Sequence, residues 1–516
     1  MRKLLVLITP LIASLFVAPH SATAATPLLE ASIEGGRVAG RLDGALATFQ
    51  GIRYAAPPVG DLRWRAPQPV VPWPGVQSAL KPGAACIQKP EMSIDNGGGD
   101  VRPIAEDCLF LNVWTPAADA GAKLPVMVWI HGGALVFGSG GTPIYSGAPL
   151  AARGAVIVTI NYRLGALGFF AHPSVAKPGD DVNFGLLDQI AALRWVQRNV
   201  AAFGGDPGNV TIFGQSAGAE SVLALFVSPL ATGLFHKGIA QSPYGIPSHT
   251  LAKARTTAAN VAAGLKLDGA KASAADLRAV PAEAFAPRVG PGESLAPSFI
   301  VGDRALPQTI LASFRKGTEA QLPLIIGSTS DDGSVAVAFG MDPAALVKKL
   351  GVARIAVKSL YPKELTDAQL GRQTARDLAF TAFARRIAWL HTARAPTWRY
   401  YYDYVGEGVR GQQAGVPHGA DIPYTMGTAA ACDCLGAAPT AQDRAAAQRA
   451  SQLWFDFAAS GTPVPRAAEA WPRDGRRDAR VLELGDTDAV RADFMSRRLN
   501  TFIGVLNLAG LLGPAN

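Results

Sequence analysis

Charged residues are scarce in this chain of 516 residues. Asp, Glu, Lys and Arg together make up 17% of it, against 49% hydrophobic residues, and the mean hydropathy is +0.17. Extensive disorder is therefore excluded, because disordered chains combine low hydrophobicity with high net charge. Length alone would suggest about three domains, but α/β folds often reach this size as one unit. We expect one large buried core.

Dense runs of Lys or Arg are also missing. The formal net charge is +8, and Arg2 and Lys3 lie in a segment that we expect to be removed, which lowers +8 by two to +6. Nucleic-acid binding usually requires basic residues clustered on one face or along one helix. We therefore expect no nucleic-acid partner, and we interpret the positive charge as a solvated surface.

Long apolar runs are absent except at the N-terminus. Two basic residues, the apolar run 4–17 and small residues up to Ala24 follow the order of a secretory signal peptide. An uncleaved anchor is the alternative, but the run is short and contains Pro10. We expect a signal peptide over 1–24, a single mature domain over 25–516, and export to the periplasm or the medium. No later run is long enough to cross a bilayer, so no stable membrane insertion is expected.

Cysteines number only four. An exported protein enters an oxidising compartment, where disulfides form. Cys86 and Cys108 enclose 21 residues and are expected to pair, which would stabilise the fold by about 3 kcal/mol in the loop-entropy model. A bridge between Cys432 and Cys434, separated only by Asp433, would be strained. Two thiols without further ligands make no zinc site, so no metal is expected and this second pair is left unassigned.

One motif organises the chain: Gly214-Gln215-Ser216-Ala217-Gly218, directly after the apolar run 210–213. The run predicts a buried strand, and 219–227 can continue as a helix. This is the strand–turn–helix context of a nucleophile elbow, in which Ser216 stands at a strained corner with its hydroxyl exposed. The glycines on either side leave room for the turn. An ordinary Gly/Ser turn is the alternative interpretation.

Strands and helices alternate around this motif. Strands are predicted over 109–114, 126–130, 156–161, 210–213, 238–242, 324–327 and 398–405, and a helix over 186–200. This alternation predicts an α/β fold with a largely parallel sheet covered by helices on both faces. Ligands of such folds bind at the carboxyl ends of the strands. The stretches 251–290 and 341–395 are interpreted as helical excursions, 502–512 as a packed terminal helix, and the glycine-rich 96–99 as part of a flexible surface loop.

A serine nucleophile needs an acid and a base, which follow it along the chain in this order. Of the seven histidines, His418 is the candidate base, because it lies in a loop directly after the strand 398–405. A hydrogen-bonded structural histidine is the alternative. The loop Asp331-Asp332-Gly333, after the strand 324–327, can supply the acid that holds the tautomer of the base. A plain turn is the alternative there.

Backbone amides are expected to stabilise the oxyanion. Residues 130–135 read Ile-His-Gly-Gly-Ala-Leu directly after a predicted strand, which is the pattern of an HGGG-type loop. The expected donors are the N–H groups of Gly133, Ala134 and Ala217. Each donor of this kind lowers the barrier by about 3 kcal/mol. Ala in the last place carries no evident cost, because the backbone is the donor.

Together these motifs resemble the carboxylesterase type B, or cholinesterase-like, family of α/β-hydrolases. Further matching segments, spread over nearly the whole mature chain, are 51–60, 106–113, 161–165, 199–207 and 454–463. The resemblance implies an α/β-hydrolase fold: a central, mostly parallel twisted sheet flanked by helices, with helical excursions that form a gorge or cap. It also implies a serine ester hydrolase that forms an acyl-enzyme and needs no metal or organic cofactor.

The resemblance also assigns residues. It implies a triad of Ser216, Asp332 and His418 and the bridge between Cys86 and Cys108. Ser221, five residues after the nucleophile, matches a serine that often contacts the acid.

Three motifs depart from the pattern of the family. Asp332 stands where Glu is usual, so the acid is one methylene shorter. Gln215 stands where Glu is common, and we expect it to affect only the surroundings of the elbow. Ala134-Leu135 replaces Gly-Phe after the two glycines, so the pocket wall is expected to differ.

The expected function is hydrolysis of a small-molecule carboxylic ester. A specialised esterase with the same mechanism, for polycarboxylate, phenolic or polymer esters, is the main alternative, and the net positive charge points weakly to anionic substrates. Amide hydrolysis by the same triad is another. A non-catalytic, cholinesterase-like adhesion module is disfavoured, because such modules lack the serine or the histidine.

Overall fold

The computed structural model describes residues 28–95, 97–177, 179–245, 248–287, 298–432, 435–464, 470–475 and 480–508. The predicted signal peptide over 1–24 and Cys434 lie outside these ranges. Within them, no helix combines the length and the apolar character that crossing a membrane requires.

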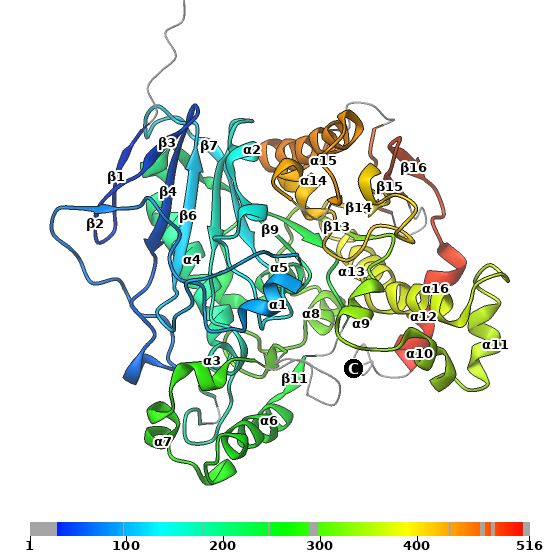
Figure 1. The fold of residues 1–516 in the computed structure, drawn as a ribbon, viewed down its shortest axis with the longest axis horizontal. Coiled ribbons are helices and arrows are strands. Elements are labelled where there is room, and N and C mark those ends of the chain that lie inside the picture. Colours follow the sequence, from blue (N-terminus) through cyan, green and yellow to red (C-terminus); the bar gives the residue numbers. More distant parts are fainter. Residues whose placement is uncertain are drawn as a thin grey trace, which may run out of the picture.

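A large twisted sheet forms the centre of the described part of the chain (Figure 1). Its strands are β3 (Arg41–Asp43), β4 (Leu46–Arg53), β6 (Phe110–Thr115), β7 (Leu124–Ile130), β8 (Val156–Ile160), β9 (Gly205–Gln215), β10 (Lys237–Gln241), β13 (Leu324–Thr329), β14 (Thr397–Tyr402), β15 (Val481–Leu484) and β16 (Ala489–Arg491). They lie in the order β16-β15-β14-β13-β10-β9-β7-β8-β6-β4-β3. Neighbours from β15 to β8 are parallel, and the pairs at both margins are antiparallel. The predicted mostly parallel sheet is confirmed.

Two small sheets accompany the large one. The first contains β1 (Glu30–Ile33), β2 (Gly36–Ala39) and β5 (Val76–Ser78), and the second pairs β11 (His249–Thr250) with β12 (Ile300–Val301).

Helices connect the strands and cover the sheet. They are α1 (Pro90–Asp95), α2 (Ala148–Ala151), α3 (Gly165–Gly168), α4 (Phe184–Asn199), α5 (Ala217–Val227), α6 (Leu251–Gly264), α7 (Ala274–Ala279), α8 (Ile310–Lys316), α9 (Ser334–Ala338), α10 (Pro343–Lys349), α11 (Ala353–Lys358), α12 (Asp367–Arg376), α13 (Ala382–His391), α14 (Ile422–Met426), α15 (Ala441–Ser460) and α16 (Ser496–Leu508).

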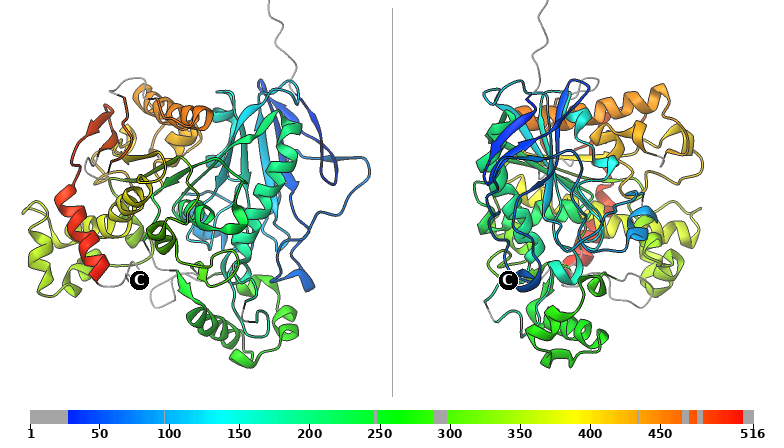
Figure 2. Two further views of the ribbon diagram at one scale, coloured as in Figure 1. Left: turned by 180° about the vertical axis from the view of Figure 1, so that it is seen from behind. Right: turned by 60° about the vertical axis from the view of Figure 1, so that its left-hand side comes forward.

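Two apolar cores lie on opposite faces of the sheet. In β7, Val128 belongs to one core and Trp129 to the other, because successive strand residues point to opposite faces. The first core is covered by α4, α5, α8 and α13, and the second by α2, α14 and α15. Seen from behind, α4 lies in front of the sheet, while α15 runs along the top of the molecule (Figure 2). Burial on both faces explains why the central strands are almost entirely apolar.

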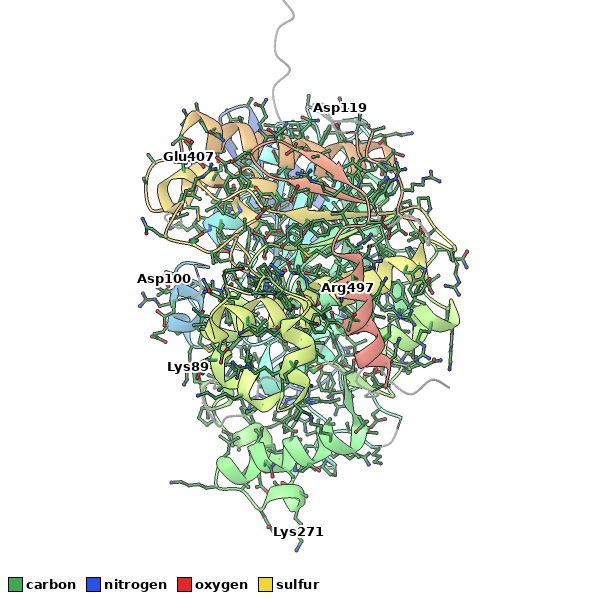
Figure 3. The ribbon with its side chains drawn as sticks, turned by 90° about the vertical axis from the view of Figure 1, so that its right-hand side faces the viewer. Lys89, Asp100, Asp119, Lys271, Glu407 and Arg497 are labelled. Carbon is green, nitrogen blue, oxygen red and sulfur yellow. A yellow bond between two sulfur atoms is a disulfide. The ribbon has the colours of Figure 1, made fainter. Side chains whose placement is uncertain are left out.

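The helical excursions are partly as predicted. Helices α6 and α7 form a lobe below the sheet, with Lys271 at its tip (Figure 3). Helices α10, α11 and α12 lie at the lower right of the molecule in Figure 1, beside α16. The predicted excursion 341–395 extends too far along the chain, however. Its last part forms α13, which packs directly on β13 and β14 of the large sheet. In α13, Phe383 and Ile387 are four residues apart and are both buried in the first core. This apolar spacing is typical of a helix that covers a sheet with one face.

Candidate active site

Ser216 lies at the junction between β9 and α5. Its backbone has φ 56° and ψ −122°, a conformation that non-glycine residues adopt only where the surrounding structure enforces it. The amide of Ser216 donates to the carbonyl of Gln241 over 2.8 Å. The side chain lines a cavity at the carboxyl ends of the strands. The sharp turn of the predicted elbow is therefore present.

The glycines of the elbow are required by close backbone contact. A Cβ added to Gly218 would lie 2.0 Å from the carbonyl oxygen of Ile130, and one added to Gly214 would lie 2.6 Å from the same oxygen. Real Cβ atoms do not approach an oxygen this closely, so any larger residue would push the elbow away from β7. The end of β7 also begins the loop that contains Gly133 and Ala134.

His418, the candidate base, lies in the loop that follows β14. Its amide donates to Ser334 Oγ over 2.8 Å, and its Nδ1 lies 2.7 Å from Asp332 Oδ1. The ring packs on Phe380, with 4.9 Å between the ring centroids. An ionised carboxylate only accepts hydrogen bonds, so Nδ1 carries the proton and Nε2 is the acceptor. That tautomer is the one a general base requires.

Asp332 is held as firmly as the base. Its Oδ2 accepts from the amide of Thr329 over 2.8 Å and from Ser242 Oγ over 2.9 Å, and the residue is fully buried. The neighbouring Asp331 instead accepts from Arg372 Nε over 2.7 Å. Of the two acidic residues in this loop, Asp332 is therefore the one that is hydrogen-bonded to His418.

The role that the resemblance implied for Ser221 is wrong. Ser221 Oγ donates to the carbonyl of Ala217 over 2.8 Å and accepts from Gln189 Nε2 over 3.0 Å. A hydroxyl has one proton, so Ser221 has none left for the carboxylate of Asp332. The serine that contacts the acid is Ser242, at the end of β10. The sequence contained a signal for it, because Ser242 is the last residue of the strand predicted over 238–242.

The oxyanion loop turns sharply after β7. Gly133, Ala134 and Leu135 have φ values of 95°, 52° and 63°, and the amide of Val136 closes the turn on the carbonyl of Gly133 over 2.9 Å. Within the described ranges, the amides of Gly133, Ala134 and Ala217 have no acceptor. Gly133 and Ala134 also line the cavity that contains Ser216. Free amides beside a nucleophile are the feature that an oxyanion hole requires.

His131 supports this loop from behind. Its ring stacks on Tyr162 with 4.4 Å between centroids, and Tyr162 donates to the carbonyl of His131 over 2.9 Å. Burial lowers the pKa of His131 to about 4, so the ring is neutral at neutral pH. A neutral, stacked ring is a structural role, and His131 is not a second base.

A buried carboxyl group lies behind the triad. Asp421 accepts from Gln241 Nε2 over 2.9 Å, and Gln241 Oε1 accepts from Trp454 over 3.0 Å. Burial, together with the nearby charge of Asp332, raises the pKa of Asp421 to about 6. Sequence analysis did not find Asp421, although it stands only three residues after His418.

The cavity in front of Ser216 has a volume of about 360 Å³. One wall comes from the segment between Cys86 and Cys108, through Ser93, Asp95 and the glycines that follow. In Figure 3, Lys89 and Asp100, which both belong to this segment, lie on the same side of the molecule as Glu407, a residue of the connection that leads to His418. A segment predicted only to be a surface loop therefore forms part of the site.

That wall is closed at its base by a disulfide. Cys86 and Cys108 are joined, with 4.9 Å between their Cα atoms. Over the described ranges, no three His, Cys, Asp or Glu side chains are grouped to hold a metal ion.

A family model matches most of the chain. The model of the carboxylesterase family matches residues 22–373 and 368–502, which together span most of the chain.

Two curated proteins are similar over most of their length. The fumonisin B1 esterase of Sphingopyxis macrogoltabida is 34% identical over 479 residues, which cover 89% of this chain and 87% of that protein. The para-nitrobenzyl esterase of Bacillus subtilis (strain 168) is 36% identical over 470 residues, covering 87% and 93%.

Solved structures share the fold. A PNB esterase structure superposes with a TM-score of 0.79 at 32% identity, over 92% of this chain and 99% of that one. A carboxylesterase of Geobacillus stearothermophilus has the same TM-score at 29% identity, over 92% and 100%.

Proposed function

The chain belongs to the carboxylesterase family and is an ester hydrolase, and from this premise we propose that Ser216, His418 and Asp332 are its catalytic triad. The observation that carries the proposal is the hydrogen bond of 2.7 Å between His418 Nδ1 and Asp332 Oδ1, in a cavity that also exposes Ser216. That bond leaves Nε2 free of a proton and directed to the cavity side of the ring.

The mechanism is a two-step acyl transfer. His418 Nε2 accepts the proton of Ser216 as Oγ attacks the ester carbonyl, and the amides of Gly133, Ala134 and Ala217 stabilise the tetrahedral oxyanion. The protonated ring then gives its proton to the leaving alcohol, and the acyl-enzyme remains. A water molecule, deprotonated by the same nitrogen, attacks the acyl carbonyl and releases the acid.

The substrate class that fits best is a neutral carboxylic ester. Asp95, an exposed residue, is the only Asp, Glu, Lys or Arg among the described residues that line the cavity. A charged acyl group would lose water there without gaining a cationic partner. The positive net charge of the chain therefore does not extend to the described lining of this cavity. The lining does not support the anionic substrates to which the net charge points.

We further propose that the protein is exported as a single domain over 25–516 after cleavage near Ala24. The order of basic, apolar and small residues in 1–24 supports export. A disulfide between Cys86 and Cys108 is compatible with an oxidising compartment.

The test of the proposed function compares the wild type with Ser216→Ala on p-nitrophenyl esters of increasing acyl length. We expect measurable turnover by the wild type and a loss of about 10⁶-fold in the variant, the usual cost of removing a triad nucleophile. Equal activity of a folded Ser216→Ala protein would refute the assignment of the nucleophile.

A further inference from the structure

Gln215, directly before the nucleophile, contacts the candidate base. Its side chain is buried, and its Nε2 lies 3.1 Å from His418 Nε2. Within the described ranges, no hydrogen bond joins Ser216 Oγ to the same ring. The position usually occupied by the nucleophile's hydroxyl is thus taken by a neutral amide.

The direction of this hydrogen bond follows from the other side of the ring. Because His418 Nδ1 donates to Asp332, Nε2 presents its lone pair, and the NH₂ group of Gln215 donates to it. The lone pair that must accept the proton of Ser216 is therefore occupied in the empty site.

The side chain of Gln215 fits a slot between two loops. A Cβ added to Gly132 would lie 3.1 Å from Gln215 Oε1, and one added to Gly419 would lie 3.6 Å from Gln215 Nε2. Gly132 belongs to the oxyanion loop and Gly419 to the loop of the base. Gln215 and Gly419 both line the cavity, so this contact lies where an ester enters.

We propose that Gln215 is a positioning residue for the base. Its amide holds His418 Nε2 in the empty site and releases it to the hydroxyl of Ser216 when an ester binds. The inference rests on the proposed function, and the exchange breaks one hydrogen bond and makes another without any covalent change. It also explains why a neutral residue stands here: an amide donor stabilises the neutral ring, whereas a carboxylate would stabilise the protonated ring.

The charges around the ring make this distinction measurable. Asp332, in the loop after β13, faces the ring of His418, and Asp421 lies close enough to interact with both of them. Phe380 and Ser334, its other contacts, are uncharged. A carboxylate at position 215 would add a negative charge directly beside Nε2, where the wild type has a neutral amide.

The experiment measures the pH dependence of two rates in Gln215→Glu, Gln215→Leu and the wild type. One is the labelling of Ser216 by a p-nitrophenyl phosphonate, and the other is kcat/KM on a neutral p-nitrophenyl ester. We expect the acid limb of both profiles to move to higher pH by about one unit in Gln215→Glu and by less in Gln215→Leu. KM should change less than kcat/KM, because the amide acts through its contact with His418.

Gln413→Glu is the matched control. Gln413 also lines the cavity, and no hydrogen bond joins it to His418 within the described ranges. The Gln413→Glu variant adds the same charge to the cavity without a hydrogen bond to His418. The acid limb of its pH profile should therefore move less than that of Gln215→Glu. Equal shifts in the two variants would show a general charge effect and overturn the inference.

The outcomes separate this inference from the proposed function. If the phosphonate fails to label Ser216 in the folded wild type at every pH, the proposed function is wrong. If labelling is normal and the acid limbs of wild type and both Gln215 variants coincide, the positioning role is wrong and the triad stands. If Gln215→Leu does not fold, judged by circular dichroism, Gln215→Glu decides alone because it preserves the shape of the side chain.

Discussion

Two adjacent aspartates in one turn have different surroundings. Asp332 is fully buried and contacts His418, Ser242 and the backbone of Thr329. Asp331 pairs with Arg372, and burial raises its pKa although that guanidinium opposes the shift. The two residues are chemically identical, so their difference in function must come from position alone.

We expect Asp332→Asn to lower kcat by about 10⁴-fold, as the loss of a triad carboxylate does when the tautomer of the base is reversed. Asp331→Asn should keep kcat within about tenfold of the wild type and mainly lower stability, because it leaves Arg372 without its partner. Steady-state kinetics and thermal unfolding of both variants check this. A larger loss of kcat in the Asp331 variant would show that Asp331, and not Asp332, is the acid of the triad.

At the residue scale, the sequence predicted what is local and missed what depends on packing. Ser216, His418 and the pair of acidic residues can be proposed from the sequence because each follows a recognisable strand. Gln215 was noted as unusual, but its contact with the base could not be predicted, since residues 215 and 418 meet only after folding. Ser221 was misassigned because spacing along a helix does not show which neighbour receives the single proton of a hydroxyl.

At the scale of elements, most central strands are predicted to within three residues at each end because each contains a continuous apolar run, whereas β9 begins five residues before the predicted strand 210–213. Helix α4 (Phe184–Asn199) agrees with the helix predicted over 186–200, and a 3-10 turn over Val200–Phe203 continues it to Gly204, which has φ 76°. The marginal strands β15 and β16 were missed. They have four and three residues, and pairing with distant partners rather than local pattern stabilises them.

The segment between Cys86 and Cys108 shows how an element gains a function from its neighbours. Locally it is a glycine-rich loop with one short helix, α1. Its residues Ser93 and Asp95 nevertheless form a wall of the cavity. The disulfide fixes both ends of the segment and so limits where this wall can lie.

Replacing both cysteines, in the double variant Cys86→Ser with Cys108→Ser, should raise KM for neutral p-nitrophenyl esters several-fold and leave kcat nearly unchanged. Within the described residues, no hydrogen bond joins the proposed triad to this segment, whereas Ser93 and Asp95 of the segment line the cavity that the ester is proposed to enter. The free energy of unfolding should fall by about 3 kcal/mol, as expected for a loop of this length. A fall in kcat at constant KM would show that the segment acts on the chemistry instead.

At the scale of the whole molecule, charge is distributed unevenly between surface and cavity. The chain carries a formal net charge of +8, yet no Lys or Arg appears among the described residues that line the catalytic cavity. A positive surface can attract anions from a distance, but this attraction decays within about 8 Å at physiological salt. Binding in the cavity depends on local groups, which are neutral there apart from the exposed Asp95.

A matched pair of esters tests this separation of surface and cavity. We expect kcat/KM for p-nitrophenyl butyrate to exceed that for the p-nitrophenyl hemisuccinate monoanion by at least about tenfold, because the extra carboxylate loses water without finding a cation. Val335→Arg, which places a guanidinium on the cavity wall, should raise kcat/KM for the hemisuccinate anion and so reduce the difference in kcat/KM between the two esters. Added salt should weaken only the anionic reaction, since a neutral ester experiences no long-range attraction. An anion preferred by the wild type at high salt would mean that a cationic group reaches the substrate after all, and the neutral-ester assignment would have to be replaced by a polycarboxylate one.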